Sequence, residues 1–263
     1  MKVIIDDKEF EAEYGEYILD VARRNGIHIP TLCHSDAVPG QGSCRLCIVE
    51  VYERGKNKVV VSCLYPITGE IKVYTNSEKI HRMRRNIIRL LAARAPGSEY
   101  IKKLKEEYGI PEETRFKVDE KEKCVLCGLC VKACEKLGSM AISTVNRGAT
   151  KKVAPPFEEP PVDCIGCTSC AHVCPTGAIE VREYEGKRVI WNRTFELLKC
   201  TSCGRYFITR EQYEYMKNRH GIDMKELLCD RCRQKSTAEK LVSLYKKLLV
   251  KKTLFQCYRL QKD

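Results

Sequence analysis

One cysteine spacing, C-x2-C-x2-C-x3-C, occurs twice in this chain and constrains its fold more than any other feature. The first run begins at Cys124 and the second at Cys164. Three cysteines in so short a loop can present thiolates to three corners of one 4Fe–4S cube, while the fourth reaches across to a second cube. Each run is followed by a short apolar segment, at residues 141–143 and 178–180. The repeat therefore predicts two related halves around a pseudo-twofold axis that hold two 4Fe–4S clusters.

The predicted ligand sets cross from one run to the other, because the fourth cysteine of each run binds the other cube. The first cluster takes three cysteines of the first run and the last of the second: Cys124, Cys127, Cys130 and Cys174. The second cluster takes the remaining four: Cys134, Cys164, Cys167 and Cys170. Gly128 and Gly166 suit loops in which backbone amides bend toward cluster sulfurs. A pair of zinc sites is the alternative, but zinc is bound by cysteine doublets rather than by runs of four.

The chain has 17 cysteines, and its N-terminus argues against their pairing as disulfides. Asp6, Asp7 and Lys8 stand where a signal peptide needs an apolar core, so we expect no export signal. No uncharged apolar run approaches the roughly 18 residues of a membrane span. In a reducing compartment, clustered cysteines are metal ligands more often than disulfide partners. We therefore expect a cytoplasmic protein, without a membrane span, whose cysteines bind metal.

The formal net charge of +12 raises the question of a nucleic-acid partner, since Lys and Arg neutralise phosphates. The basic residues are spread along the chain rather than gathered in one block. A site of four thiolates also carries about −2 once its metal is counted, which offsets much of the excess. We therefore expect no nucleic-acid partner, and a solvated basic surface with some role in docking.

A third cysteine pattern lies in the N-terminal part of the chain. Its spacing, C-x10-C-x2-C-x15-C, differs from the plant-type ferredoxin pattern C-x4-C-x2-C. Strand signals occur before it, at residues 3–5 and 10–12, and within it, at 47–51 and 59–61. Helical spacing of apolar residues predicts a helix at 17–22, and further helices within 79–108, broken at Pro96 and Gly97.

The two long runs resemble a bacterial-type two-cluster ferredoxin domain. With the N-terminal pattern, they are similar to the N-terminal region of the large NADH-dehydrogenase subunit of respiratory complex I. The same module occurs in iron–sulfur subunits of NAD-linked hydrogenases and formate dehydrogenases. The resemblance covers roughly residues 1–185 and implies a ubiquitin-like β-grasp domain at the N-terminus. It also implies that one 2Fe–2S cluster is held by four residues: Cys33, Cys44, Cys47 and Cys63.

The chain departs from these large subunits in two respects. They often carry a further cluster, held by one histidine and three cysteines, between the two domains. Residues 64–123 contain no cysteine, so we expect that cluster to be absent and His81 to be an ordinary residue of a helix surface. His34 and His172, next to or within the cysteine patterns, are likewise expected not to bind metal. A molybdopterin-type catalytic domain would need far more chain than remains.

The last cysteines form two C-x2-C doublets followed by a basic helix. The doublets, Cys200 with Cys203 and Cys229 with Cys232, have the spacing of a tetrahedral zinc site. We favour structural zinc in a zinc-ribbon-like module over a single iron or another cluster. Cys257 belongs to none of the patterns and is expected to be structural. An amphipathic helix is predicted at 238–251, with leucines set among lysines.

These observations predict an α+β protein of five segments. They are a 2Fe–2S β-grasp domain at 1–78, a helical connector at 79–118, a two-4Fe–4S ferredoxin domain at 119–185, a four-cysteine module at 186–235 and a terminal helix at 236–263.

The predicted function is electron transfer within a multi-subunit oxidoreductase. The sequence predicts three redox clusters but contains no P-loop. Gly40 and Gly42 form a G-x-G that lies inside a cluster loop, so it is not a dinucleotide fingerprint. We expect no catalysis by the chain itself. We expect instead a flavoprotein subunit that binds NAD(P)H, or a soluble ferredoxin, and a catalytic subunit of the hydrogenase, formate dehydrogenase, transhydrogenase or sulfur-reducing type. The alternative is a regulatory or nucleic-acid-binding sensor that uses its clusters and its zinc module for recognition.

Overall fold

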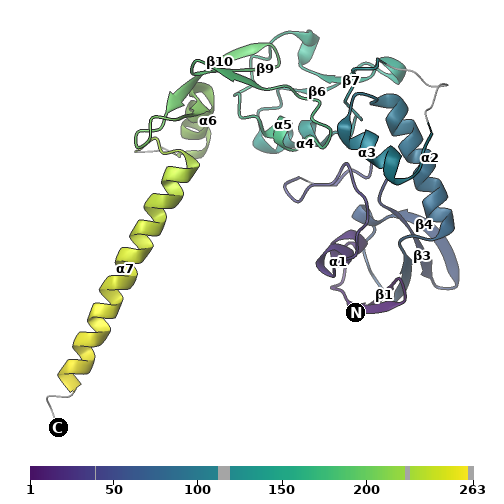
Figure 1. Ribbon diagram of the computed structural model, residues 1–263, viewed down its shortest axis with the longest axis horizontal. Coiled ribbons are helices and arrows are strands. Elements are labelled where there is room, and N and C mark those ends of the chain that lie inside the picture. Colours follow the sequence, from purple (N-terminus) through teal and green to yellow (C-terminus); the bar gives the residue numbers. More distant parts are fainter. Residues whose placement is uncertain (39, 112–118, 223–225, 260–263) are drawn as a thin grey trace. The chain divides into compact units, whose positions relative to one another are not determined.

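The computed structural model describes residues 1–38, 40–111, 119–222 and 226–259, with side chains as far as residue 246 (Figure 1). The chain divides into two compact units. The first comprises residues 1–164, 168–181 and 190–193, and the second comprises residues 165–167, 182–189 and 194–263. Within the described ranges, no helix has both the length and the apolar content that crossing a membrane requires.

A five-stranded mixed sheet opens the first unit, in the strand order β2-β1-β5-β3-β4. β1 and β5 are parallel, and the other neighbouring strands are antiparallel. Asp6 and Asp7 both have positive φ, as the tight turn between β1 and β2 requires. All four predicted strand segments are confirmed with bounds within three residues, and β5 is additional. The strands are β1 (Lys2–Ile5), β2 (Lys8–Glu11), β3 (Ile48–Glu53), β4 (Lys56–Val61) and β5 (Ile71–Tyr74).

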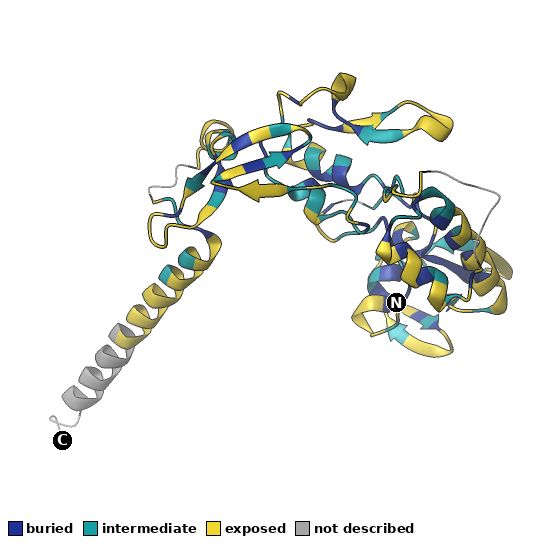
Figure 2. Cartoon of the chain, turned by 45° about the horizontal axis from the view of Figure 1, so that its top comes forward, coloured by how far each residue is buried: buried dark blue, intermediate teal, exposed yellow. Residues whose placement is uncertain are grey.

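The core of this sheet follows from the alternation of its residues. Val3 and Ile5 of β1 are fully buried, since successive side chains of a strand point to opposite faces. The apolar residues of α1 (Ile18–Arg24) are buried with them in one hydrophobic cluster, and Figure 2 colours such buried residues dark blue. α1 ends just before Gly26, which has a φ of +73°, so the predicted helix at 17–22 is confirmed.

Two helices follow, as predicted for residues 79–108. α2 (Glu78–Arg94) and α3 (Glu99–Glu107) pack against each other, and each begins at a serine whose side chain accepts a backbone N–H. The break falls at Ala95–Ser98, where Pro96 and Gly97 lie. The apolar spacing that predicts these helices places Ile87, Ile88, Leu90 and Leu91 on one stripe, and this expectation is wrong for Leu90, which is 59% exposed, whereas Ile88 is fully buried.

The two long cysteine runs have the same local backbone. Leu126 and Gly128 of the first run have positive φ, and so do the equivalent residues of the second, Gly166 and Thr168. A helix begins directly afterwards in each run, α4 (Leu129–Leu137) and α5 (Ser169–His172), and these two helices pack together. The internal repeat read from the cysteines is thus a repeat of structure.

The repeat is less regular beyond the helices. After the first run, the apolar segment at 141–143 leads into β6 (Ser143–Val145), which pairs with β7 (Lys152–Ala154). After the second run, residues 178–180 are not a strand, and the next strand begins only at Arg182. Residues 154–161, between the two runs, contain four prolines that predict an extended connection, and the structure has a short 3₁₀ turn (Pro156–Glu158) there.

The second unit is built on a four-stranded sheet in the order β11-β10-β9-β8, followed by two helices. Phe195 and Ile208 are buried on this sheet. The terminal helix α7 runs further than the predicted 238–251, and its described residues Leu241 and Leu244 are 62% and 56% exposed. The elements are β8 (Arg182–Tyr184), β9 (Lys187–Ile190), β10 (Arg193–Lys199), β11 (Tyr206–Thr209), α6 (Arg210–His220) and α7 (Asp230–Arg259).

Candidate metal centres

The four N-terminal cysteines lie together in the first unit, and all four are buried. They form two pairs. The backbone N–H of Cys44 donates to Cys33 Sγ at 3.3 Å, and the sulfurs of Cys47 and Cys63 are 3.4 Å apart. The two pairs are also near each other, because the charges of Cys33 and Cys44 raise the pKa of Cys63, so the structure brings together the whole set predicted for the 2Fe–2S cluster.

The β3–β4 hairpin explains why two of these residues meet. Cys47 directly precedes β3 and Cys63 closely follows β4, and the hairpin register places Ile48 opposite Val61. Ser62 ties the two ends together, because its backbone N–H and its hydroxyl both donate to the Cys47 carbonyl oxygen. The residues that separate Cys47 from Cys63 in the sequence are thus mainly those of the hairpin.

One thiol of each pair is prepared to lose its proton. A hydrogen bond from Cys44 lowers the pKa of Cys33 to about 5, and a hydrogen bond from Cys63 lowers the pKa of Cys47 to about 6. The same interactions raise the pKa values of Cys44 and Cys63. Since thiolates are the form that binds iron, the protein supplies part of the charge of the site before metal enters.

A cavity of about 200 Å³ lies at the first 4Fe–4S site. Its wall contains all four cysteines predicted for this cluster, together with Lys152, Thr176 and Trp191, which the sequence did not point to. The set therefore fits a cluster, because three cysteines of one loop and a fourth from the second run line one space. The four are Cys124, Cys127, Cys130 and Cys174.

Backbone amides already point at sulfurs of this site. The N–H of Leu126 donates to Cys124 Sγ at 3.4 Å, and that of Ala178 donates to Cys174 Sγ at 3.3 Å. Burial raises the pKa of Cys127 to about 11 and that of Cys130 to about 12. Without a cation these two thiols keep their protons, and bound iron reverses that preference.

The second predicted set is divided between the two compact units. Cys134, Cys164 and Cys170 belong to the first unit and Cys167 belongs to the second. The N–H of Ala141 donates to Cys134 Sγ at 3.2 Å, as amides do at the first site. This ligand set stays a prediction from the spacing and from the repeated backbone of the two runs.

The 2Fe–2S loop and the first 4Fe–4S loop touch. The Ser43 hydroxyl donates to the Cys127 carbonyl oxygen at 3.1 Å. Gln41 lies against Gly128, where an added Cβ would come within 2.6 Å of its side-chain oxygen. Leu32 and Leu46 also share one hydrophobic cluster with Cys127 and Leu129. Sequence reasoning missed these contacts, because Gln41 and Ser43 carry no motif signal of their own.

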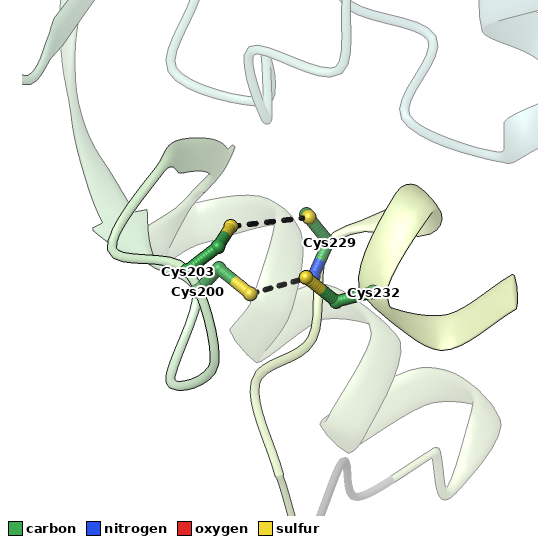
Figure 3. A group of neighbouring side chains, drawn as sticks. All are labelled: Cys200, Cys203, Cys229 and Cys232. Atoms are coloured by element: carbon green, nitrogen blue, oxygen red, sulfur yellow. Dashed lines mark hydrogen bonds between the residues drawn. The ribbon is translucent and has the colours of Figure 1, made fainter. Parts of the chain in front are cut away.

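The C-terminal doublets meet within the second unit (Figure 3). The sulfurs of all four cysteines lie within 4.8 Å of one another, and those of Cys203 and Cys229 are 3.7 Å apart. Four thiolates around one tetrahedral zinc would be separated by about 3.8 Å, given a Zn–S bond of about 2.3 Å. A backbone N–H from Cys229 lowers the pKa of Cys200 to about 6. The arrangement can hold one ion.

Two of the three histidines considered as ligands are exposed. His81 is exposed and stacks on Tyr108, with ring centroids 5.2 Å apart. His172 is exposed in α5, and His34 lies 3.4 Å from a carboxylate oxygen of Asp36. Cys257 falls outside the residues whose side chains are described.

Comparisons with known families agree with the cysteine geometry. Residues 1–78 match the 2Fe–2S iron–sulfur cluster binding domain, and residues 117–181 match the 4Fe–4S dicluster domain. A further 4Fe–4S dicluster model matches residues 163–205. The chain is an iron–sulfur protein.

Its relatives are subunits of NAD(P)-linked enzymes. The chain is 29% identical to an NADH-quinone oxidoreductase subunit of Rhizobium meliloti, over 89% of the chain and 31% of that protein. It is 33% identical to the NADP-reducing hydrogenase subunit HndD of Solidesulfovibrio fructosivorans, over 70% of the chain and 36% of that protein. It is 30% identical to the NADPH-Fe(3+) oxidoreductase subunit alpha of Geobacter sulfurreducens, over 77% of the chain and 26% of that protein. The chain thus spans about a third of the length of these relatives.

A solved structure gives the same result for the fold. A chain of the NAD⁺-reducing NiFe-hydrogenase in its H2-reduced state superposes with a TM-score of 0.57 and 26% identity, over 67% of this iron–sulfur protein and 85% of that chain. The resemblance inferred from the cysteine patterns is therefore confirmed. Electron transfer is favoured over the alternative of a regulatory sensor.

A first prediction concerns the cavity. Cys127→Ser should remove one 4Fe–4S signal from the electron paramagnetic resonance spectrum, because serine replaces one of four thiolates, while the 2Fe–2S signal persists. Cys257→Ser makes the same chemical change outside all four sets and should leave every signal in place. An unchanged spectrum of the Cys127 variant would refute its assignment.

A second prediction concerns the C-terminal site. Cys203→Ser should release the bound ion and unfold the module around it, since structural metal sites contribute folding energy directly. Metal analysis should show the loss of about one zinc per chain, and limited proteolysis should cut the C-terminal region first. Full retention of zinc in this variant would contradict the four-cysteine site.

Proposed function

We propose that this chain is an electron-transfer subunit of a multi-subunit oxidoreductase. It relays electrons between a subunit that handles flavin and NAD(P)H, or a ferredoxin, and a catalytic subunit. The observation that carries the proposal is the contact between two cysteine loops, in which Ser43 donates to the Cys127 carbonyl oxygen. Electron tunnelling falls steeply with distance, so two redox centres held by touching loops can exchange electrons directly.

The chain would hold three clusters and one ion. The 2Fe–2S cluster would be held by Cys33, Cys44, Cys47 and Cys63. The first 4Fe–4S cluster takes the four cysteines of the cavity. The second takes the divided set: Cys134, Cys164, Cys167 and Cys170. Zinc is proposed at Cys200, Cys203, Cys229 and Cys232, because their sulfurs crowd around one point as ligands of a single ion do.

The proposed architecture keeps the segments read from the sequence. The N-terminal sheet with α1 is proposed as a β-grasp domain, and the β10–β11 pair with the start of α7 as a zinc-ribbon-like module. Zinc has no redox chemistry, so that module would stabilise the fold and offer a docking surface.

The protein's own groups would set how readily each cluster accepts an electron. Buried cysteines exclude water from the 2Fe–2S site, and amides such as those of Leu126 and Ala178 donate to sulfur. Donors to sulfur stabilise the more negative, reduced state and raise the reduction potential. Low reduction potentials such as those of ferredoxins, about −400 mV, fit the proposed role.

The proposal predicts that electrons from NAD(P)H reach this chain only through a partner. The complex, purified anaerobically from its source through a tag on this chain, should contain a flavoprotein subunit. NAD(P)H should then bleach the visible absorbance of the clusters within the complex. The isolated chain serves as the control, and it should be reduced by dithionite but not by NAD(P)H.

Two results would contradict a role in electron transfer. If the chain purifies without partners and reduces a substrate unaided, it is not a relay subunit. If it holds its clusters but binds nucleic acid with an affinity that falls steeply with salt, the regulatory alternative replaces the proposal.

A further inference from the structure

Two arginines are buried among the described residues, Arg84 and Arg188, and both reach the backbone of a cysteine loop. Arg188 donates from Nη1 to the carbonyl oxygen of Gly166, which precedes Cys167, at 2.7 Å. Arg84 reaches the loop of the proposed 2Fe–2S cluster. Arginine is rarely buried unless it is paired, so both positions require a reason.

Arg84 holds the peptide groups on both sides of one cysteine. Its Nε donates to the carbonyl oxygen of Leu46 at 3.2 Å, and its Nη2 donates to that of Ile48 at 2.7 Å. The residue between them is Cys47. The guanidinium fork fixes both peptide planes, which a single amine could not do with the same geometry.

The two arginines differ in how their charge is balanced. Arg188 Nε lies 2.7 Å from the Glu183 carboxylate, which offsets its charge. No carboxylate within the described part of the chain forms an ion pair with Arg84, which is 2% exposed. Tyr108, Asp6 and Cys47 face it, and the Asp6 carboxylate accepts hydrogen bonds from Thr75. Arg84 thus brings a positive charge with little direct compensation to the cysteine loop.

A buried positive charge acts differently on the two states of a cluster. The 2Fe–2S centre with four thiolates is negative when oxidised and gains a further negative charge on reduction. A nearby cation therefore stabilises the reduced state more than the oxidised one, and the attraction is stronger in the interior than in water. Its removal must lower the reduction potential.

We propose that Arg84 is a positioning residue that raises the reduction potential of the 2Fe–2S centre by placing its charge beside Cys47. The inference rests on the proposed function, because it needs the cluster at Cys33, Cys44, Cys47 and Cys63. It assigns to α2 a role in tuning a centre whose ligands lie outside that helix.

The test is a redox titration of the full-length, cluster-loaded protein, followed by electron paramagnetic resonance. Arg84→Gln should lower the equilibrium constant for reduction of the 2Fe–2S centre at least tenfold, which for one electron is about 59 mV. Arg84→Lys keeps the charge and should stay close to the parent. Arg82→Gln, the same change at an exposed position of α2, should leave the potential unchanged.

The possible outcomes separate this inference from the function. A 2Fe–2S signal at the parent potential in Arg84→Gln overturns the role of the charge and leaves Arg84 as a structural contact. If Arg84→Gln loses the cluster, Arg84→Lys decides: a potential near that of the parent supports the inference, and one shifted at least tenfold toward the oxidised form overturns it. A parent protein without any 2Fe–2S signal would instead refute the proposed function.

Discussion

The structure depends on bringing many cysteine side chains close together. In their thiolate form these groups repel one another unless a cation compensates their charge. Burial raises the pKa of Cys127 and of Cys130, so without metal these groups stay neutral. At the N-terminal site, hydrogen bonds within each pair lower the pKa of one thiol and raise that of the other. Iron changes this balance, since it binds thiolates and removes the repulsion between them. Folding around the cysteines and cluster binding are therefore one coupled equilibrium.

The same constraint explains the unusual backbone of the cysteine loops. Three thiols of one short loop can face a common point only if the chain turns sharply, and positive φ at Leu126 and Gly128 provides that turn. The second run repeats it with Gly166 and Thr168. Leucine and threonine adopt this conformation at a cost of about 1–2 kcal/mol each, which the rest of the site must offset. The strained residues thus mark the loops in which function has priority over local preference.

Cysteine spacing was enough to predict three groups of cysteines that the structure brings together, but not their surroundings. The sets at 33–63 and 200–232, and the cavity set ending at Cys174, come together because each spacing matches a hairpin or a tight loop. The contact of Ser43 with Cys127, and that of Arg84 with the carbonyls beside Cys47, join segments between 36 and 84 residues apart. Such contacts depend on how α2 and the loops pack, and single residues carry no spacing signal. For the same reason two further features were not predicted. One is β5, which pairs with β1 although most of the domain's sequence separates them, and the other is the exposure of Leu90.

We infer that thiolates of this chain cage iron and sulfide rather than form disulfides or bind zinc alone. The most direct measurement is the iron and acid-labile sulfide content of the anaerobically prepared full-length protein. One 2Fe–2S and two 4Fe–4S clusters predict about ten irons per chain with a matching amount of labile sulfide. A protein that holds far fewer irons and releases no sulfide would rule out the three clusters.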